Sequence, residues 1–353
     1  MQRKEFPKTS GQGMQWPYAS EHSCDNEVKD NLPRISIITP SYNQGIYLEE
    51  TIRSIVLQNY PNYELIIIDG GSTDNTLEVI HKYEPWITYW VSEKDRGQSH
   101  AIRKGLAQAT GDIINWINSD DLCAPGAFYH IAAEFDLEKY DVLCGYCDYF
   151  LNDLNHLDKR NERMGVFATV GDTLLACHIN QPSTFFKASV IKKLDIDEGF
   201  HYTMDVDLWY RYLLMTGQSR IFFSDKLLTY FRLHGTSKSV AEYAKFEGDR
   251  NKVYYNVLLG LEQPSALLKY MSLRMPDFTS FKPKCYQVSI STDKVKSFIL
   301  NYAWPAVIYY NGIKDYKSAR ECLSSAINCG QPWSFTLLRQ VIKHYLVPSA
   351  LLR

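Results

Sequence analysis

The sequence predicts an α/β fold built on a mostly parallel sheet with helices on its faces. Short apolar runs alternate with stretches in which apolar residues recur at helical spacing, in units of about 30 residues. The run Leu65–Ile68 is apolar at every position, as expected for a strand of a parallel sheet that is covered on both faces. Polar residues follow the ends of these runs, and in such sheets the carboxyl ends of the strands share one edge.

The elements between residues 34 and 127 follow this rhythm closely. A helix is expected after the first strand because Leu48, Ile52 and Ile55 share one face. Ser72 and Asp74 offer side-chain oxygens that can cap the start of the next helix. We expect strands at residues 35–39, 65–68, 87–91 and 113–117, and helices at 48–56, 75–83 and 100–109.

Beyond residue 127 the pattern is less regular. A helix is expected at 128–135, a strand at 142–150 and a further helix at 205–215. The end of the chain reads as helical but is interrupted by prolines. The predicted organisation is a leader segment at 1–33, a domain at 34–240 with halves at 34–127 and 128–240, and a helical region at 241–353.

The composition is that of a folded protein with a full hydrophobic core. The chain has 353 residues, of which 45% are hydrophobic and 22% charged, and this excludes a disordered chain. The formal net charge of −2 provides no overall basic field, so no nucleic-acid partner is expected. No apolar run approaches the ~18–20 residues of a membrane span, and the N-terminus lacks the apolar core of a signal peptide. We therefore expect a cytoplasmic protein.

Four aspartates follow the ends of the predicted strands: Asp69, Asp95 and the adjacent pair Asp120 and Asp121. Each alone could be a helix cap or turn residue, but together they are expected at one sheet edge. Carboxylates gathered in this way repel one another unless a cation lies among them, and Mn²⁺ and Mg²⁺ prefer oxygen ligands. The chain contains neither GxxxxGK[ST] nor GxGxxG, so a nucleotide diphosphate at this edge would need such a metal.

Two long segments resemble a known enzyme family. The segments ISIITPSYNQGIYLEETIRSIVLQNYPNYELIIIDGGSTDNT and SEKDRGQSHAIRKGLAQATGDIINWINSDD resemble the inverting family-2 glycosyltransferases, densely over residues 34–127 and more thinly to about residue 239. Trp16-Pro17 and Phe246-Glu247 are similar to one bacterial subgroup that builds polysaccharides. The resemblance implies a GT-A-type fold, which is a mixed, mostly parallel sheet with flanking helices, here followed by a C-terminal helical extension.

The resemblance also implies a nucleotide-sugar site at the predicted sheet edge. Asn118-Ser119-Asp120 stands where the family has Asp-x-Asp, so Asn118 replaces the first acid and Asp120 is the first choice as metal ligand. His100 and Arg103 stand where the family has Asp and Asn, and we assign them no role. The residues that the resemblance places against the nucleotide-sugar are Pro40, Tyr42, Asp69, Asp95, Arg96, Asn118 and Asp120.

The second half of the domain carries the implied base and acceptor residues. Met204-Asp205 aligns with the family's Glu-Asp, which makes Asp205 the implied catalytic base, although an acid here also favours a helix N-terminus. Gln181 and Asp207 are implied to line the acceptor and sugar pocket. His234 is implied to ligate the metal or touch the diphosphate, and Asp121 is a further candidate ligand.

The function implied is transfer of a sugar from a nucleotide-sugar, expected to be a UDP-sugar, to an acceptor hydroxyl of a glycan or lipid-linked chain. The expected mechanism is a metal-assisted single displacement that uses Mn²⁺ or Mg²⁺. One alternative is a non-catalytic nucleotide-sugar-binding protein on the same fold, and another is a nucleotide-dependent oxidoreductase. Residues 331–353 combine basic and apolar side chains, so peripheral contact with the cytoplasmic face of the inner membrane competes with simple packing of this tail.

Overall fold

A computed structural model describes residues 6–7, 16–18, 31–151, 153–235, 243–331 and 334–346. The chain forms two compact units. Unit one comprises residues 1–164, 179–204 and 220–241, and unit two comprises residues 165–178, 205–219 and 242–353. Two segments within 34–240, residues 165–178 and 205–219, group with the C-terminal helices in unit two.

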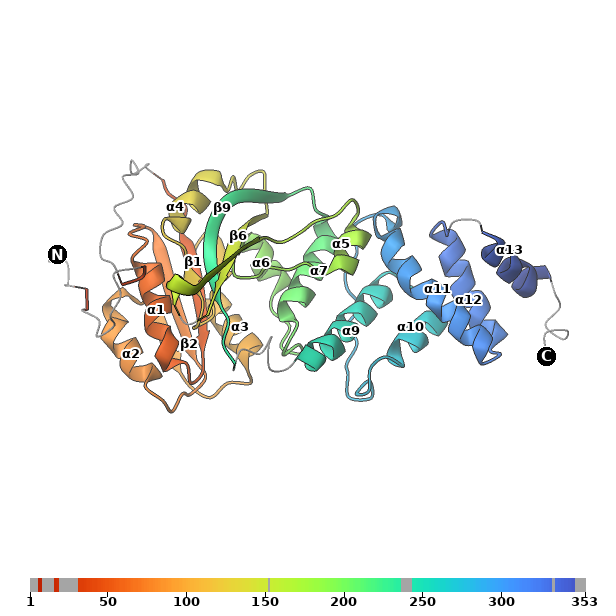
Figure 1. Ribbon diagram of the computed structural model, residues 1–353, viewed down its shortest axis with the longest axis horizontal. Coiled ribbons are helices and arrows are strands. Elements are labelled where there is room, and N and C mark those ends of the chain that lie inside the picture. Colours follow the sequence, from red (N-terminus) through yellow and green to blue (C-terminus); the bar gives the residue numbers. More distant parts are fainter. Residues whose placement is uncertain are drawn as a thin grey trace. The chain divides into compact units, whose positions relative to one another are not determined.

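Unit one contains the sheet, and its first four strands are parallel in the order β3-β2-β1-β4. Ser41 lies opposite Asp69, and Asp69 lies opposite Ser92, so the carboxyl ends of three strands are level with one another. The parallel sheet predicted from the sequence is therefore confirmed. The elements are β1 (Ile35–Ser41), α1 (Gly45–Val56), β2 (Tyr63–Asp69), α2 (Thr76–Tyr83), η1 (Glu84–Trp86), β3 (Tyr89–Ser92), α3 (Gln98–Gln108) and β4 (Ile113–Trp116) (Figure 1).

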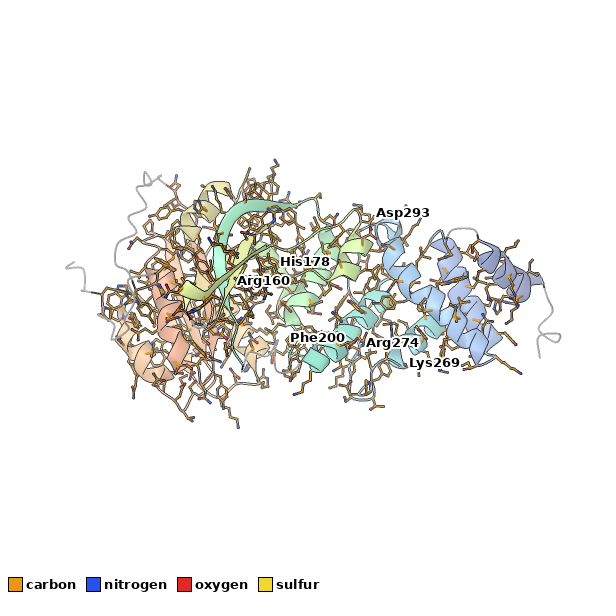
Figure 2. The ribbon with its side chains drawn as sticks, viewed as in Figure 1. Arg160, His178, Phe200, Lys269, Arg274 and Asp293 are labelled. Carbon is orange, nitrogen blue, oxygen red and sulfur yellow. The ribbon has the colours of Figure 1, made fainter. Side chains whose placement is uncertain are left out.

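The remaining strands make the sheet mixed. β8 pairs antiparallel with β4 and β6, while β9 pairs parallel with β6 along a long, curved path (Figure 1). β7, which carries Arg160, forms a hairpin with β6 (Figure 2). The Arg160 guanidinium lies 4.5 Å from the ring centroid of Tyr149. These elements are β5 (Leu122–Cys123), α4 (Ala127–Glu134), β6 (Val142–Phe150), η2 (Leu154–His156), β7 (Leu157–Glu162), β8 (Thr184–Lys187), α6 (Ala188–Leu194) and β9 (Ile221–Arg232).

The core of unit one lies between the parallel strands and their helices. Ile35 and Ile37 of β1 are fully buried in the same cluster as Ile52 of α1. Helix α3 approaches β1 so closely that a Cβ at Gly105 would lie 2.4 Å from a methyl carbon of Ile38. This close packing holds the first turn of α3 at the carboxyl edge of the sheet.

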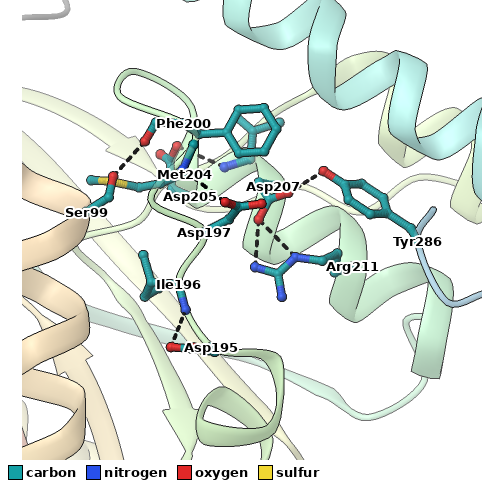
Figure 3. A network of polar contacts seen from close by, with 12 residues as sticks. Ser99, Asp195, Ile196, Asp197, Phe200, Met204, Asp205, Asp207, Arg211 and Tyr286 are labelled. Carbon is teal, nitrogen blue, oxygen red and sulfur yellow. Dashed lines mark hydrogen bonds and ion pairs between the residues drawn. The ribbon is translucent and has the colours of Figure 1, made fainter. Parts of the chain in front are cut away.

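Unit two is helical. Its buried Asp207 accepts hydrogen bonds from Arg211 of the same helix and from the Tyr286 hydroxyl (Figure 3). No helix among the described residues is long and apolar enough to cross a membrane. The elements are α5 (Val170–Ala176), α7 (Met204–Thr216), α9 (Tyr243–Gly260), α10 (Ser265–Ser272), η3 (Thr292–Val295), α11 (Lys296–Gly312), α12 (Tyr316–Asn328), α13 (Phe335–Val341) and η4 (Ile342–Leu346).

Candidate active site

The loop after β2 is organised by Asp69. This buried carboxylate accepts hydrogen bonds from the backbone N–H groups of Gly71 and Ser72, at 3.1 and 2.9 Å, and from the Ser92 hydroxyl at 2.5 Å. The Ser72 hydroxyl also donates to Asp69 and accepts from the backbone N–H of Asn43 at 2.7 Å. Asp69 thus joins the ends of β1, β2 and β3. Its acceptor positions are largely taken by protein donors, so its direct contact with a nucleotide stays a prediction.

Tyr42 and Asp95 lie together beside Gly70. A Cβ at Gly70 would lie 2.9 Å from an oxygen of Asp95 and 3.3 Å from a ring carbon of Tyr42. The Tyr42 ring is 62% exposed, and the other oxygen of Asp95 accepts from the Gly97 N–H at 2.7 Å. An exposed aromatic face and a carboxylate therefore lie side by side at the sheet edge. Pro40 is buried within β1, which leaves it little surface for the predicted contact with a nucleoside.

The loop after β4 is held by hydrogen bonds of Asn118 and Asp121. The Asn118 amide donates to one oxygen of Asp121 at 3.1 Å and accepts from Gln98 at 2.7 Å. The other oxygen of Asp121 accepts from the backbone N–H of Arg232 at 3.0 Å. Burial, followed by the Asp120 carboxylate, raises the pKa of Asp121 well above its ordinary value. Both Asp121 oxygens accept hydrogen bonds from protein donors, and its predicted role as a metal ligand stays a prediction.

Asp120 and His234 are adjacent although 114 residues separate them in the chain. The His234 Nε2 atom lies 2.8 Å from an Asp120 oxygen, and the His234 ring lies 4.8 Å from the ring centroid of Tyr47. The His234 side chain is 11% exposed and the Asp120 side chain is 19% exposed, so both are partly accessible. The structure thus brings together the two residues predicted to ligate a metal.

A divalent cation fits these two residues when a ligand completes its coordination. The described residues contain no cluster of three or more His, Cys, Asp or Glu side chains that would hold a metal by themselves. Mg²⁺ and similar ions are commonly held by one or two protein groups and by substrate phosphates. The Asp120 carboxylate and the His234 imidazole would supply two such protein groups to the ion.

Two residues that the sequence did not single out complete this part of the site. Arg232 is buried, pairs with Glu50 of α1, and donates from its Nε to the backbone carbonyl of Asp120 at 2.9 Å. Nothing in the local sequence marks Glu50, which follows another glutamate in an ordinary amphipathic helix. Glu50 and Arg232 are 182 positions apart in the sequence, so only the fold brings them together.

Arg96 forms an ion pair with Glu198. Its guanidinium donates twice to one oxygen of Glu198, at 3.0 and 2.6 Å, and Arg103 donates to the other oxygen at 3.1 Å. The Arg96 side chain is 67% exposed, and an ion pair this accessible contributes at most about 1 kcal/mol. An anionic ligand can therefore replace Glu198 as the partner of Arg96. Glu198, like Glu50, carries no local sequence signal that would have selected it.

The segment that carries Glu198 is fastened to the start of α3. The buried Ser99 hydroxyl lies 2.6 Å from the Phe200 carbonyl and 2.8 Å from the Met204 sulfur (Figure 3). Met204 begins α7, and Asp205 is the next residue in the chain. The first turn of α3 therefore anchors the residue immediately before the predicted base.

Gln181 links the segment before β8 to strand β4 through hydrogen bonds. Its side-chain amide donates to the Asn115 side chain at 3.0 Å and to the Trp116 carbonyl at 2.7 Å, both on β4. Asn115 in turn donates to the Pro182 carbonyl at 2.8 Å. These bonds hold the segment before β8 against β4, and the predicted contact of Gln181 with acceptor or sugar stays a prediction.

The two acids at the start of α7 have different surroundings. Asp207 is fully buried and bonded to Arg211 and Tyr286, which argues against its predicted contact with acceptor or sugar (Figure 3). Asp205 is partly buried and accepts from the backbone N–H of Val206 at 2.8 Å. Burial raises the pKa of Asp205 to about 6. A carboxylate with this pKa is ionised at neutral pH and is a stronger base than an ordinary aspartate.

Comparison with known proteins finds a family match in the sheet-bearing part of the chain. The family described as Glycosyl transferase family 2 matches residues 36–196, the stretch that carries the sheet edge. The chain is similar to glycosyltransferase family 2 over these residues. An uncharacterized glycosyltransferase of Rickettsia typhi is 30% identical over 213 residues, which cover 57% of this chain and 64% of the relative. The chain thus spans slightly less than two thirds of that relative's length.

Two further proteins resemble this chain over most of its length. A Campylobacter jejuni protein, GalNAc(5)-diNAcBac-PP-undecaprenol beta-1,3-glucosyltransferase, is 24% identical over 326 residues, covering 90% of this chain and 96% of that protein. The crystal structure of S. aureus TarS 1-349 in complex with UDP-GlcNAc has a TM-score of 0.51 at 17% identity, covering 85% and 93% of the two chains. The predicted fold, a mostly parallel GT-A-type sheet followed by helices, is confirmed.

Proposed function

We propose that this protein is an inverting glycosyltransferase that moves a sugar from a UDP-sugar to an acceptor hydroxyl during bacterial polysaccharide biosynthesis. The observation that carries the proposal is the Asp120–His234 pair, which a family-2 sheet presents at the same edge as Tyr42 and Asp95. The likeness to the Campylobacter glucosyltransferase along nearly the whole chain supports a lipid-linked acceptor. Mn²⁺-dependent release of UDP from UDP-sugars tests the proposal.

The donor is held by the residues at the sheet edge. The exposed Tyr42 ring offers a stacking face, Asp95 and Asn118 offer polar contacts to base or ribose, and Arg96 can exchange Glu198 for the diphosphate. Asp120 and His234 would hold Mn²⁺ or Mg²⁺, which offsets the negative charge that builds up on the diphosphate leaving group. Asp69 acts indirectly in this proposal, by fixing the loop that presents the donor contacts.

The base we propose is Asp205. Its carboxylate accepts the proton of the acceptor hydroxyl while that oxygen attacks the anomeric carbon of the sugar. The bond from this carbon to the diphosphate oxygen breaks, and its electron pair leaves with the nucleoside diphosphate. A single displacement of this kind inverts the anomeric centre and needs no nucleophile on the protein.

The fall of kcat/KM at acidic pH is expected to reflect protonation of Asp205. A base must be unprotonated, so kcat/KM for the acceptor should fall tenfold per pH unit below about pH 6 and level off above it. The measurement is kcat/KM from pH 4.5 to 8 at saturating Mn²⁺, with UDP affinity measured in parallel as the control. A limb near pH 4 with unchanged UDP binding would contradict the assignment, because an aspartate with an unshifted pKa would then be the base.

The end of unit two presents an apolar stripe that supports peripheral membrane contact. Leu338, Ile342 and Tyr345 are spaced four and three residues apart and are 47%, 42% and 46% exposed, while Leu337 and His344 are buried. Arg339 and Lys343 lie in the same stretch, which contains no acidic residue. Basic and apolar side chains together favour the interface of an anionic bilayer, where a lipid-linked acceptor would be presented. Residues 347–353 of the predicted tail lie outside the described residues.

Replacing Leu338, Ile342 and Tyr345 by glutamine is expected to reduce co-sedimentation with anionic liposomes by about tenfold or more, since each apolar side chain buried in the interface contributes ~1 kcal/mol. The matched control is Leu151→Gln, which removes an equally exposed leucine from unit one. Binding by the triple variant equal to that of the control, or no binding by the wild type, would contradict membrane contact through this stripe.

A further inference from the structure

Residues of the N-terminal leader pack against helix α1 and strand β5. The Trp16 indole is buried and donates to the Cys123 carbonyl at 2.8 Å. Arg53 of α1 donates to the carbonyls of Pro7 and Pro17, each at 3.1 Å, and its guanidinium lies 4.7 Å from the centroid of the Phe6 ring. The described parts of the leader are thus fastened to the same helix that carries Glu50.

One hydrogen bond from the leader is linked to the proposed metal residues through the partly buried Glu50 and the buried Arg232. The Tyr18 hydroxyl donates to one oxygen of Glu50 at 2.7 Å, and the other oxygen of Glu50 pairs with Arg232. Arg232 then donates to the carbonyl of Asp120 at 2.9 Å and, from its backbone N–H, to Asp121 at 3.0 Å. The series is continuous from the leader to the loop after β4.

Arg232 has little freedom to leave this position. Its guanidinium lies 4.4 and 4.8 Å from the ring centroids of Phe150 and Tyr47, and the residue is 2% exposed. A buried charge that loses its partner is costly, so the Arg232 position depends on Glu50. Because Tyr47 also lies against His234, the same environment contacts both members of the Asp120–His234 pair.

We infer that Tyr18, Glu50 and Arg232 are positioning residues for the Asp120–His234 pair, so that the leader is a working part of the metal-dependent nucleotide site. The inference rests on the proposed function, because it requires that Asp120 and His234 act together on a metal-bound diphosphate. Partners that orient metal ligands without touching the metal commonly alter affinity by about 10- to 100-fold. Arg232 would orient Asp120 through the hydrogen bond to its backbone carbonyl. Glu50 would hold Arg232 in place, and Tyr18 would hold Glu50.

The test is the affinity for UDP, measured by calorimetry in Mn²⁺ and again in EDTA with the full chain. Glu50→Gln is expected to weaken UDP binding about tenfold or more in Mn²⁺, and by less than about twofold in EDTA. Tyr18→Phe, which removes one hydroxyl and spares the fold, is expected to weaken binding ~3-fold in Mn²⁺ only. In the double variant the Tyr18→Phe effect should largely vanish, because both changes act on one series of contacts.

Helix α1 offers matched controls. Glu49 precedes Glu50 and accepts from the Lys82 ammonium at 2.8 Å. Because this ion pair lies outside the Tyr18–Glu50–Arg232 series, Glu49→Gln and Lys82→Met should leave Mn²⁺-dependent UDP affinity unchanged. If Glu50→Gln and Tyr18→Phe behave like these controls while the wild type depends on Mn²⁺, the positioning role is wrong and the proposed function stands. If wild-type affinity is the same in Mn²⁺ and EDTA, the metal role fails and the inference fails with it.

Discussion

Asp205→Asn is expected to reduce the rate of sugar transfer by about 10²- to 10⁴-fold and to leave UDP affinity within about twofold of wild type. A base acts on the acceptor hydroxyl during the chemical step, so its loss should appear in kcat and not in donor binding. The measurement is steady-state transfer together with calorimetric UDP binding. The control is Asp207→Asn two residues later, which removes a fully buried, hydrogen-bonded carboxylate and should lower the melting temperature.

The pH dependence of the folding stability of Asp205→Asn distinguishes Asp205 from Asp207. The pKa of Asp205 is raised from an ordinary 3.8 to about 6 in the folded protein, so ionisation of this buried group opposes folding. The penalty is absent below pH 4, grows up to pH 6 and is then constant at no more than ~3 kcal/mol. Asp205→Asn should therefore be more stable than wild type at pH 8 and equal to it near pH 4. Full transfer activity in Asp205→Asn would show that another residue is the base.

Asp120→Ala is expected to weaken UDP binding in Mn²⁺ by about 100-fold, or ~3 kcal/mol, and to leave binding in EDTA unchanged. The substitution removes one member of the pair formed with His234 and takes no bond away from the buried Asp121. His234→Gln should show a smaller loss of the same kind. The control is Asp112→Ala, which changes an aspartate at the amino end of the same strand, where it accepts from the Arg34 N–H.

Unchanged affinity in Asp120→Ala at saturating Mn²⁺ would remove the metal assignment. Loss of affinity in EDTA as well as in Mn²⁺ would show instead that Asp120 supports the loop after β4 generally. Melting temperatures of both variants distinguish these outcomes from unfolding, because the 19% exposed Asp120 side chain contributes little to the core.

The first half of the fold was predictable because its strands follow a simple rule. A parallel strand covered on both faces tends to be a continuous apolar run, and residues 65–68 of β2 show this plainly. β1 and β4 carry some polar residues, but every position in them is buried. β7 gives no such signal, since LDKRNE is charged and mostly exposed and forms only through the hairpin with β6. β5 is two residues long and is defined by its partner β9.

The site was predictable in position and not in detail. The register of β1, β2 and β3 follows from strand direction, so the meeting of polar residues at one edge could be expected. Which carboxylates remain accessible depends on bonds between distant residues, and these saturate Asp69 and bury Asp121. Glu50 and Glu198 were missed for the same reason, because their arginine partners lie 182 and 102 residues away.

The central claim is that this protein consumes a nucleotide-sugar with the help of a metal at Asp120 and His234. Its most direct test is the release of UDP from a panel of UDP-sugars, with and without Mn²⁺, by wild type and Asp120→Ala. We expect at least one UDP-sugar to be consumed by wild type in Mn²⁺, with release lost in EDTA and in the variant. A UDP-sugar that binds and stabilises the protein in Mn²⁺ but is never consumed, with or without candidate acceptors, would contradict the claim and identify a non-catalytic binding protein.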